Sequence, residues 1–186
     1  MSGIIRMYRR DDDGSLAFRE AWYDEEYKQV VVNHGAVGHQ STTDETDVDD
    51  EAAADNLMAA FAAQCTEDGY AEIPAEEQFW VVAQFALKTK DGTERDRHME
   101  RKAKAVLASH LAWRGLGAVE RSTLGNARLN IFCLCPDVAK AVNAIKVCVR
   151  AEGLDSTKLS IAAAPYSDPE AFKLKHSPKS GTGFTL

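Results

Sequence analysis

Long hydrophobic runs are absent from this 186-residue sequence. Its longest apolar segment extends from Phe79 to Leu87 and is far shorter than the roughly 20 residues that a helix needs to cross a bilayer. The first residues, Met1 to Asp13, carry both signs of charge and lack the apolar core of a secretion signal. These absences favour a soluble cytoplasmic protein that does not bind membranes.

Cysteine is scarce as well. The four cysteines, Cys65, Cys133, Cys135 and Cys148, lie in regular apolar segments rather than in the loop-rich framework of a disulfide-bonded secreted domain. A structural zinc site usually takes four ligands from two close pairs, whereas Cys133 and Cys135 form a single close pair. The alternative is that both are small core residues on the inward face of a strand, beside Leu129 and Ile131. We favour core packing and expect neither a metal nor a cofactor.

Catalytic signatures are missing too. Gly115-Leu116-Gly117 follows a predicted helix instead of linking a strand to a helix, so it does not read as a dinucleotide loop. Lys179-Ser180 lacks the glycine-rich spacing of a phosphate loop. His176-Ser177 lies in an irregular tail without a Gly-x-Ser-x-Gly motif. We therefore expect a protein that is not an enzyme.

Positive charge is rare in the first half of the chain and abundant in the second. Residues 1–77 contain 5 Lys and Arg against 19 Asp and Glu, and residues 78–186 contain 17 against 10. The halves therefore carry net charges of -14 and +7. An asymmetry of this size indicates either a second half that binds a polyanion or two halves that dock against each other.

The first half predicts an antiparallel sheet covered by one helix. Three alternating segments, from Ile4 to Arg9, Leu16 to Tyr23 and Tyr27 to Asn33, are separated by acidic turn signals. Leu57, Met58, Phe61 and Cys65 then recur at helical spacing, in a helix that starts at an Asp49 or Asp50 cap and ends at Asp68-Gly69. This order of elements is typical of the α+β class.

From its start to about residue 75, the chain resembles a WGR domain. The family motif is a strand that ends in Trp-Gly-Arg, a small hydrophobe and Gly, and the helix of the family ends near Gly-Tyr. The corresponding positions here are His34, Gly35, Ala36, Val37, Gly38, Gly69 and Tyr70. His34 stands in place of the motif Trp, and Ala36 in place of the motif Arg. The resemblance implies a WGR-like acidic domain over residues 1–77. The family is associated with nucleic-acid binding in which the motif Trp and Arg side chains help, so the resemblance implies the fold more than the activity.

The acidic run after this motif argues against phosphate binding by the first half. Lys and Arg drive binding to a phosphate backbone by displacing counterions, and carboxylates oppose it. The run comprises Asp44, Glu45, Asp47, Asp49, Asp50 and Glu51. It lacks the Gly and the closing Glu of a calcium loop. We expect the stretch from Ser41 to Glu51 to be a solvated loop whose last members favour the positive end of the next helix.

The second half predicts a ferredoxin-like βαββαβ domain over residues 78–164. Strands are expected at Phe79 to Leu87, Ala118 to Thr123, Arg128 to Cys135 and Leu159 to Ala164, and helices from Glu94 to about Ala112 and from Pro136-Asp137 to Gly153. The resemblance is one of pattern only, and this fold hosts many functions. Residues 165–186 show little periodicity and are expected to form an extended C-terminal arm.

Basic side chains mark a candidate nucleic-acid surface on this second half. Three lie on the outer side of the first predicted helix and three on the outer side of the second, and an aromatic residue of the third strand offers a ring for base stacking. The candidate residues are Arg97, Arg101, Lys104, Phe132, Lys140, Lys146 and Arg150. The alternative is that the charges form a solvated surface and that the ring belongs to the core.

Two functions follow from these patterns. The first is a non-enzymatic interaction protein whose two modules contact each other and present a composite surface to a macromolecular partner. The second is a nucleic-acid-binding protein that uses the basic domain, with the acidic domain competing for the same surface.

The opposite charges of the halves generate a first testable prediction. Separately produced residues 1–77 and 78–186 should bind each other, and their affinity should fall as salt is raised, because salt screens charges over about 10 Å at 0.1 M. Calorimetric titration at low and high salt measures this. Absence of a salt-sensitive affinity would show that the halves do not dock electrostatically.

Overall fold

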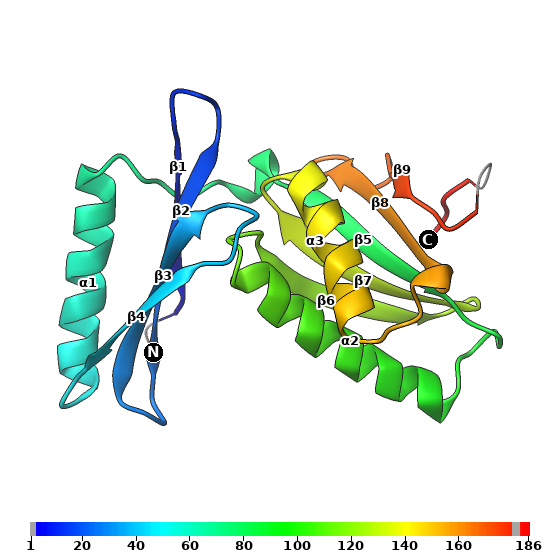
Figure 1. The fold of residues 1–186 in the computed structure, drawn as a ribbon, viewed down its shortest axis with the longest axis horizontal. Coiled ribbons are helices and arrows are strands. Elements are labelled where there is room, and N and C mark those ends of the chain that lie inside the picture. Colours follow the sequence, from blue (N-terminus) through cyan, green and yellow to red (C-terminus); the bar gives the residue numbers. More distant parts are fainter. Residues whose placement is uncertain (1–2, 180–182) are drawn as a thin grey trace. The chain divides into compact units, whose positions relative to one another are not determined.

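The structure is a computed structural model, which describes residues 3–179 and 183–186 and contains two compact units (Figure 1). The first unit consists of Met1–Ile73 with Trp113–Gly115, and the second of Pro74–Ala112 with Leu116–Leu186. No helix within the described residues is long and apolar enough to cross a membrane. Both units mix helices with antiparallel sheets, so the predicted α+β class is confirmed.

The first unit contains a four-stranded antiparallel sheet in the order β1-β2-β3-β4. The strands are β1 (Ile5–Arg10), β2 (Leu16–Asp24), β3 (Gln29–Ala36) and β4 (Thr42–Asp47). The first three occur where the alternating apolar segments predict them, with bounds that differ by a few residues. Because residues two apart share a face, Ala21, Val30 and Val32 all lie on the side that the helix covers.

Strand β4 was not predicted, and the expectation of a solvated loop from Ser41 to Glu51 is wrong over Thr42–Asp47. These residues pair with β3 in the register His34↔Thr42 to Gln29↔Asp47. An edge strand forms its ladder through backbone groups and does not need apolar side chains on both faces. Three of its six residues are threonines, which favour strands, and its exposed carboxylates discourage pairing with a further strand.

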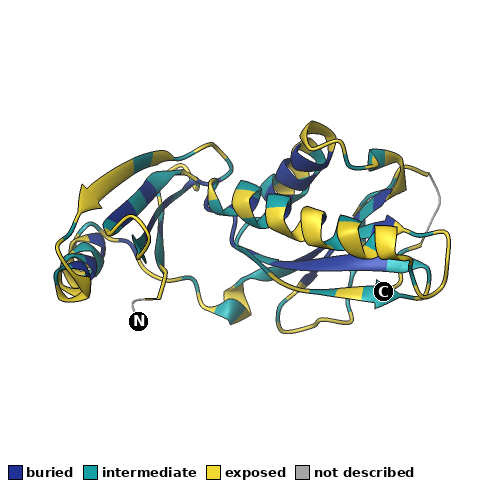
Figure 2. Ribbon diagram, turned by 90° about the horizontal axis from the view of Figure 1, so that it is seen from below, coloured by how far each residue is buried: buried dark blue, intermediate teal, exposed yellow. Residues whose placement is uncertain are grey.

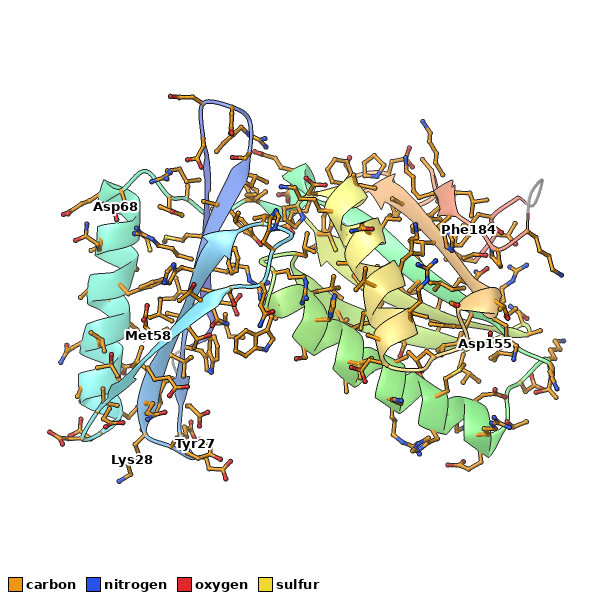
Figure 3. All side chains as sticks on the ribbon, viewed as in Figure 1. Tyr27, Lys28, Met58, Asp68, Asp155 and Phe184 are labelled. Atoms are coloured by element: carbon orange, nitrogen blue, oxygen red, sulfur yellow. The ribbon has the colours of Figure 1, made fainter. Side chains whose placement is uncertain are left out.

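Helix α1 (Glu51–Glu67) covers one face of this sheet. The Asp50 side chain caps it by accepting a hydrogen bond from the Ala53 amide at 2.8 Å, so the predicted role of the end of the acidic run is confirmed. Ala54 and Met58 pack on Ala21 and Val30, and Figure 3 shows Met58 between the helix and the strands. This cluster forms the core between the helix and the sheet, and Phe18 and Val37 are buried outside it.

The second unit contains a five-stranded antiparallel sheet in the order β6-β7-β5-β8-β9 with two helices. Its elements in chain order are β5 (Phe79–Ala86), α2 (Glu94–Ala112), β6 (Ala118–Gly125), β7 (Arg128–Cys135), α3 (Val138–Ala151), β8 (Leu159–Pro165) and β9 (Lys173–His176), with short turns of helix at η1 (Ala75–Glu77) and η2 (Ser156–Lys158). All the elements predicted between residues 79 and 164 are present. The short β9 follows them and adds a strand beside β8.

Strand β9 corrects the prediction of an extended arm over residues 165–186. Lys173, Leu174 and His176 pair with β8, although four residues are too few to produce a clear alternating pattern in the sequence. Residues 183–186 lie against the sheet, since the Gln84 side chain donates to the Thr185 carbonyl oxygen at 2.9 Å. Phe184 also contacts Phe172, with ring centroids 5.7 Å apart. The part of the predicted arm at residues 180–182 lies outside the described residues.

The two faces of the second sheet differ in what covers them. Leu159 lines the same pocket as two residues of α3, so its side chain lies on the face of the sheet that the helices cover. Leu159 pairs with Phe85, and Phe85 pairs with Leu129, so all three side chains lie on this face. The alternate residues of the central strand, Trp80, Val82 and Gln84, point to the opposite side, which we call the outer face. Figure 2 shows the buried residues of this unit in the sheet and on the sides of the helices that face it.

A glycine directly before β6 generates a prediction about stability. Gly117 has a φ of 94°, a value that side chains rarely adopt, and a Cβ at this position would overlap the carbonyl oxygen of Leu134. Gly117→Ala should lower the free energy of unfolding by about 1–3 kcal/mol from backbone strain, and by more if β7 has to shift. Chemical denaturation measures the change. The control is Gly125→Ala, whose Cβ would meet nothing within 4 Å and which should change stability by less than about 1 kcal/mol.

Candidate functional site

A basic pocket lies in the second unit where α3, η2, β8 and β9 meet. Its volume is about 540 Å³, which falls within the range of about 300–1,000 Å³ that is typical of small-molecule sites. The lining residues are Lys146, Arg150, Ser156, Thr157, Leu159, His176, Pro178 and Lys179. Three of them are permanent cations and one is an imidazole, whereas none is a carboxylate. The lining that the structure describes is therefore uniformly basic.

Helix α3 supplies two of the cations. Lys146 and Arg150 are four residues apart and therefore occupy the same side of the helix. The apolar stripe of α3, which includes Ile145 and Val149, is buried, and this burial fixes which side of the helix faces away from the sheet. The helix contains three basic residues and no acidic one. Across the described residues, no carboxylate forms an ion pair with Lys146 or Arg150.

Strand β9 brings the imidazole to these cations. His176 pairs with Ile161 at the end of β9, next to the positions of Pro178 and Lys179. Burial is the largest influence on the pKa of His176, followed by the charges of Lys146 and Arg150, and all three lower it from its usual value. These influences all favour the neutral form of the imidazole.

The turn η2 provides hydroxyl groups on the remaining side. Asp155 caps this turn, accepts hydrogen bonds from the Thr157 amide at 3.1 Å and from its hydroxyl at 2.5 Å, and pairs with Lys158 at 3.3 Å. The hydrogen bond from Thr157 is the largest influence on the pKa of Asp155, which is lowered. The carboxylate is thus already engaged within the turn that Figure 3 marks at Asp155. Within the described residues the Ser156 hydroxyl has no such internal partner, so it is the hydroxyl suited to a ligand.

The chemistry of this pocket suits an anion. Ammonium and guanidinium groups that converge without a carboxylate among them attract negative charge, and charge-assisted hydrogen bonds are the strongest class. No group of three or more His, Cys, Asp and Glu side chains that could hold a metal ion is found within residues 3–179 and 183–186.

The other predicted basic residues lie elsewhere on the second unit. Arg97 and Arg101 on α2 are 4.0 and 3.6 Å from the carboxylate of Glu94, so their charges are partly compensated. Lys104 is exposed on the same helix, and Lys140 lies in the first turn of α3, outside the pocket. The structure therefore brings two of the six predicted cations, Lys146 and Arg150, into one site.

The predicted stacking residue, Phe132, lies on the outer face and is only 2% exposed. The Arg121 guanidinium lies 3.6 Å from its ring centroid, and Trp80 meets it edge-on. Trp80 itself stacks on Tyr166, with ring centroids 5.6 Å apart. A nucleic-acid base could stack on Phe132 only after Arg121 had moved away, so these rings act as packing in the structure as it stands.

The positions of the WGR resemblance lie at the end of β3 and at the end of α1. His34 lies 3.1 Å from the Asp44 carboxylate across the β3–β4 pair, and Val37 is fully buried. Gly38, in the turn after β3, uses its amide to donate to the Arg114 carbonyl oxygen at 2.8 Å. Gly35 and Ala36 are the last residues of β3. Together these positions form a structural turn with an acidic neighbour.

The remaining positions of the resemblance lie after the C-terminal end of α1. Gly69 has a φ of 81°, which ends the helix, and Tyr70 is almost fully buried. The guanidinium groups of Arg9 and Arg19 lie over the Tyr70 ring, with their Cζ atoms 4.8 and 4.4 Å from its centroid. Arg19 also pairs with Asp68, and this hydrogen bond is the largest cause of the lowered pKa of that carboxyl. Elsewhere in this unit Arg6 pairs with the buried Glu20. Most cations of the first unit are therefore already engaged within it.

Sequence reasoning predicted only Lys146 and Arg150 of the residues that line the basic pocket, and it missed the polar residues His176, Lys179, Ser156 and Thr157. His176 was considered only as part of a catalytic motif and set aside because its segment looked irregular. The one available signal is that Lys173, Lys175 and His176 cluster in a short segment, which gives β9 a basic character. Nothing in the order of residues indicates that this segment returns to α3.

Burial of the cysteines generates a prediction about reactivity. All four are free and buried, and burial, the main cause, raises the pKa of Cys133 to about 12. Because the thiolate is the reactive form, the folded chain should react negligibly with a disulfide reagent at pH 8, and all four thiols should react once it is unfolded. Spectrophotometric thiol counting with and without denaturant tests this. Rapid reaction of any thiol in the native chain would contradict the core assignment.

Known proteins provide no assignment for this chain. No family model, no curated protein and no solved structure matches it. Its function must therefore be argued from its own side chains, and the basic pocket of the second unit is the site that carries the argument.

Proposed function

We propose that the chain is a non-enzymatic binding protein whose second unit holds an anionic group of its partner in the basic pocket. The observation that carries this proposal is the convergence of Lys146, Arg150 and Lys179 with His176 in one concavity that no carboxylate lines. Side chains from a helix and from a separate strand meet there. Such convergence of like charges is unfavourable because the charges repel one another, and a bound anion offsets this repulsion.

The distribution of charge within the first unit supports assigning this role to the second unit. Arg6, Arg9 and Arg19 pair with carboxylates of their own unit. The first unit therefore offers few free cations to a phosphate, and its net charge repels one. This argues for an anion site in the second unit even if the first unit is related to WGR domains.

The fold-level resemblances remain proposals. A four-stranded sheet with one helix supports the WGR-like assignment of the first unit, and the order β5, α2, β6, β7, α3, β8 supports a ferredoxin-like second unit. Neither resemblance carries the functional argument, since the same folds host unrelated activities. Electrostatic docking of the acidic half against the basic half likewise stays a prediction.

Nucleic acid is the second candidate partner. It is favoured by the exposed cations of α2 and α3, which include Lys104 and Arg150. Two observations weaken it: Arg97 and Arg101 are near Glu94, and Phe132 is covered by Arg121. A polymer bound along both helices would depend on α2 as much as on the pocket, and this difference distinguishes the two candidates.

Charge removal inside and outside the pocket tests the proposal. Inorganic pyrophosphate, titrated into the full chain at low salt, should bind, and Lys146→Gln or Arg150→Gln should weaken binding about tenfold or more, because a hydrogen bond to a charged group contributes about 1.5–3 kcal/mol. Calorimetry measures the affinity.

The matched control is Lys104→Gln, which removes the same charge from α2 of the same unit. It should change pyrophosphate affinity less than about twofold, since an exposed charge at a distance is screened. Equal losses from Lys104→Gln and Lys146→Gln, together with tight binding of single-stranded RNA or DNA, would favour the nucleic-acid candidate. No binding of either probe would reject both.

A further inference from the structure

His176 is surrounded by positive charge within the basic pocket. Lys146 and Arg150 approach it from α3, and Lys179 lies on the segment that follows β9. The turn η2 contributes the Ser156 hydroxyl, and its carboxylate, Asp155, accepts from Thr157 and is paired with Lys158. Protonation of an imidazole in this setting is unfavourable unless an anion binds beside it.

An anion reverses the electrostatic environment of this imidazole. In the empty pocket, burial and the neighbouring cations disfavour the protonated ring and lower the pKa of His176. A dianion placed between the same groups favours the protonated ring, which can then donate a hydrogen bond. Ligand binding and proton uptake are therefore linked, and each must strengthen the other.

The number of cationic groups indicates how much negative charge the ligand carries. Two permanent cations, Lys146 and Arg150, and one ring that can gain a proton line the pocket around a single ligand group. A phosphate diester carries one negative charge and continues as a chain on both sides, whereas a phosphate monoester carries about two charges and presents three acceptor oxygens at one end. A concave pocket fits an end group better than the middle of a chain.

Building on the proposed function, we infer that the basic pocket binds the dianionic end of a phosphate monoester and that His176 takes up one proton from solvent when it does so. No covalent bond forms or breaks, and the proton returns to solvent when the ligand leaves. His176 thereby couples the affinity of the site to pH.

The sign of the pH dependence follows from the two protonation states. The His176 pKa is higher in the bound state than in the empty state, so affinity for a dianion that does not itself titrate should rise as pH falls from the bound-state pKa to the empty-state pKa. Above that window affinity should be constant. Phosphate monoesters lose charge near pH 6 and would mask the effect, so sulfate is the appropriate probe.

The experiment uses the full chain and two readouts. Calorimetric titration of sulfate in two buffers with different heats of protonation gives the number of protons taken up, expected to approach one when the titration is made between the two pKa values. NMR of the His176 imidazole with and without saturating sulfate gives its pKa in both states, which should be higher with sulfate. His176→Gln should abolish the pH dependence, and His98→Gln, an exposed histidine of α2, should leave it intact.

A second comparison tests the class of ligand. At pH 8, methyl phosphate should bind at least about tenfold more tightly than dimethyl phosphate, since it carries the additional charge. Equal affinities, or an unchanged His176 pKa with bound sulfate, would overturn this inference while pocket-dependent pyrophosphate binding leaves the proposed function standing. Loss of pyrophosphate binding altogether would reject both.

The NMR measurement on the unaltered chain keeps the test of proton uptake decisive if His176→Gln fails to fold.

Discussion

The packing of α3 on the second sheet is the constraint on which the candidate site depends. Ala141, Ile145 and Val149 are buried, and this apolar stripe leaves α3 little freedom to rotate about its axis. Lys146 and Arg150 are therefore held at the side of the helix that overlooks η2 and β9. The positions of the cations are set by hydrophobic burial elsewhere on the same helix, which is how a packed core orients a polar site.

Strand β9 completes the arrangement. It adds a fifth strand beside β8 and delivers His176 to the two cations of α3. The strand is short and half exposed, so its backbone ladder with β8, rather than a core of its own, holds it in place. One side of the pocket is therefore formed by the firmly packed helix α3, and the other by β9, whose position depends on few hydrogen bonds.

The charge asymmetry of the chain takes on a different meaning in the structure. In the first unit Arg6, Arg9 and Arg19 are paired with carboxylates, so its few cations act in folding. In the second unit the excess positive charge is uneven: α2 carries Glu94 close to two of its arginines, and α3 has no acidic residue. The net charge of a segment is thus a weaker guide to binding than the local absence of a counter-charge.

The sequence by itself determined most of the elements, because apolar periodicity, the Asp50 cap and the Gly69 and Gly153 helix ends are local signals that a folded chain obeys. It also determined that α3 is basic. The tertiary structure alone decided that Thr42–Asp47 is a strand and that β9 exists, because both are edge strands held by backbone pairing, which leaves little imprint on side-chain order. It also decided the site, since the approach of His176 to Lys146 depends on a chain return that no local pattern encodes.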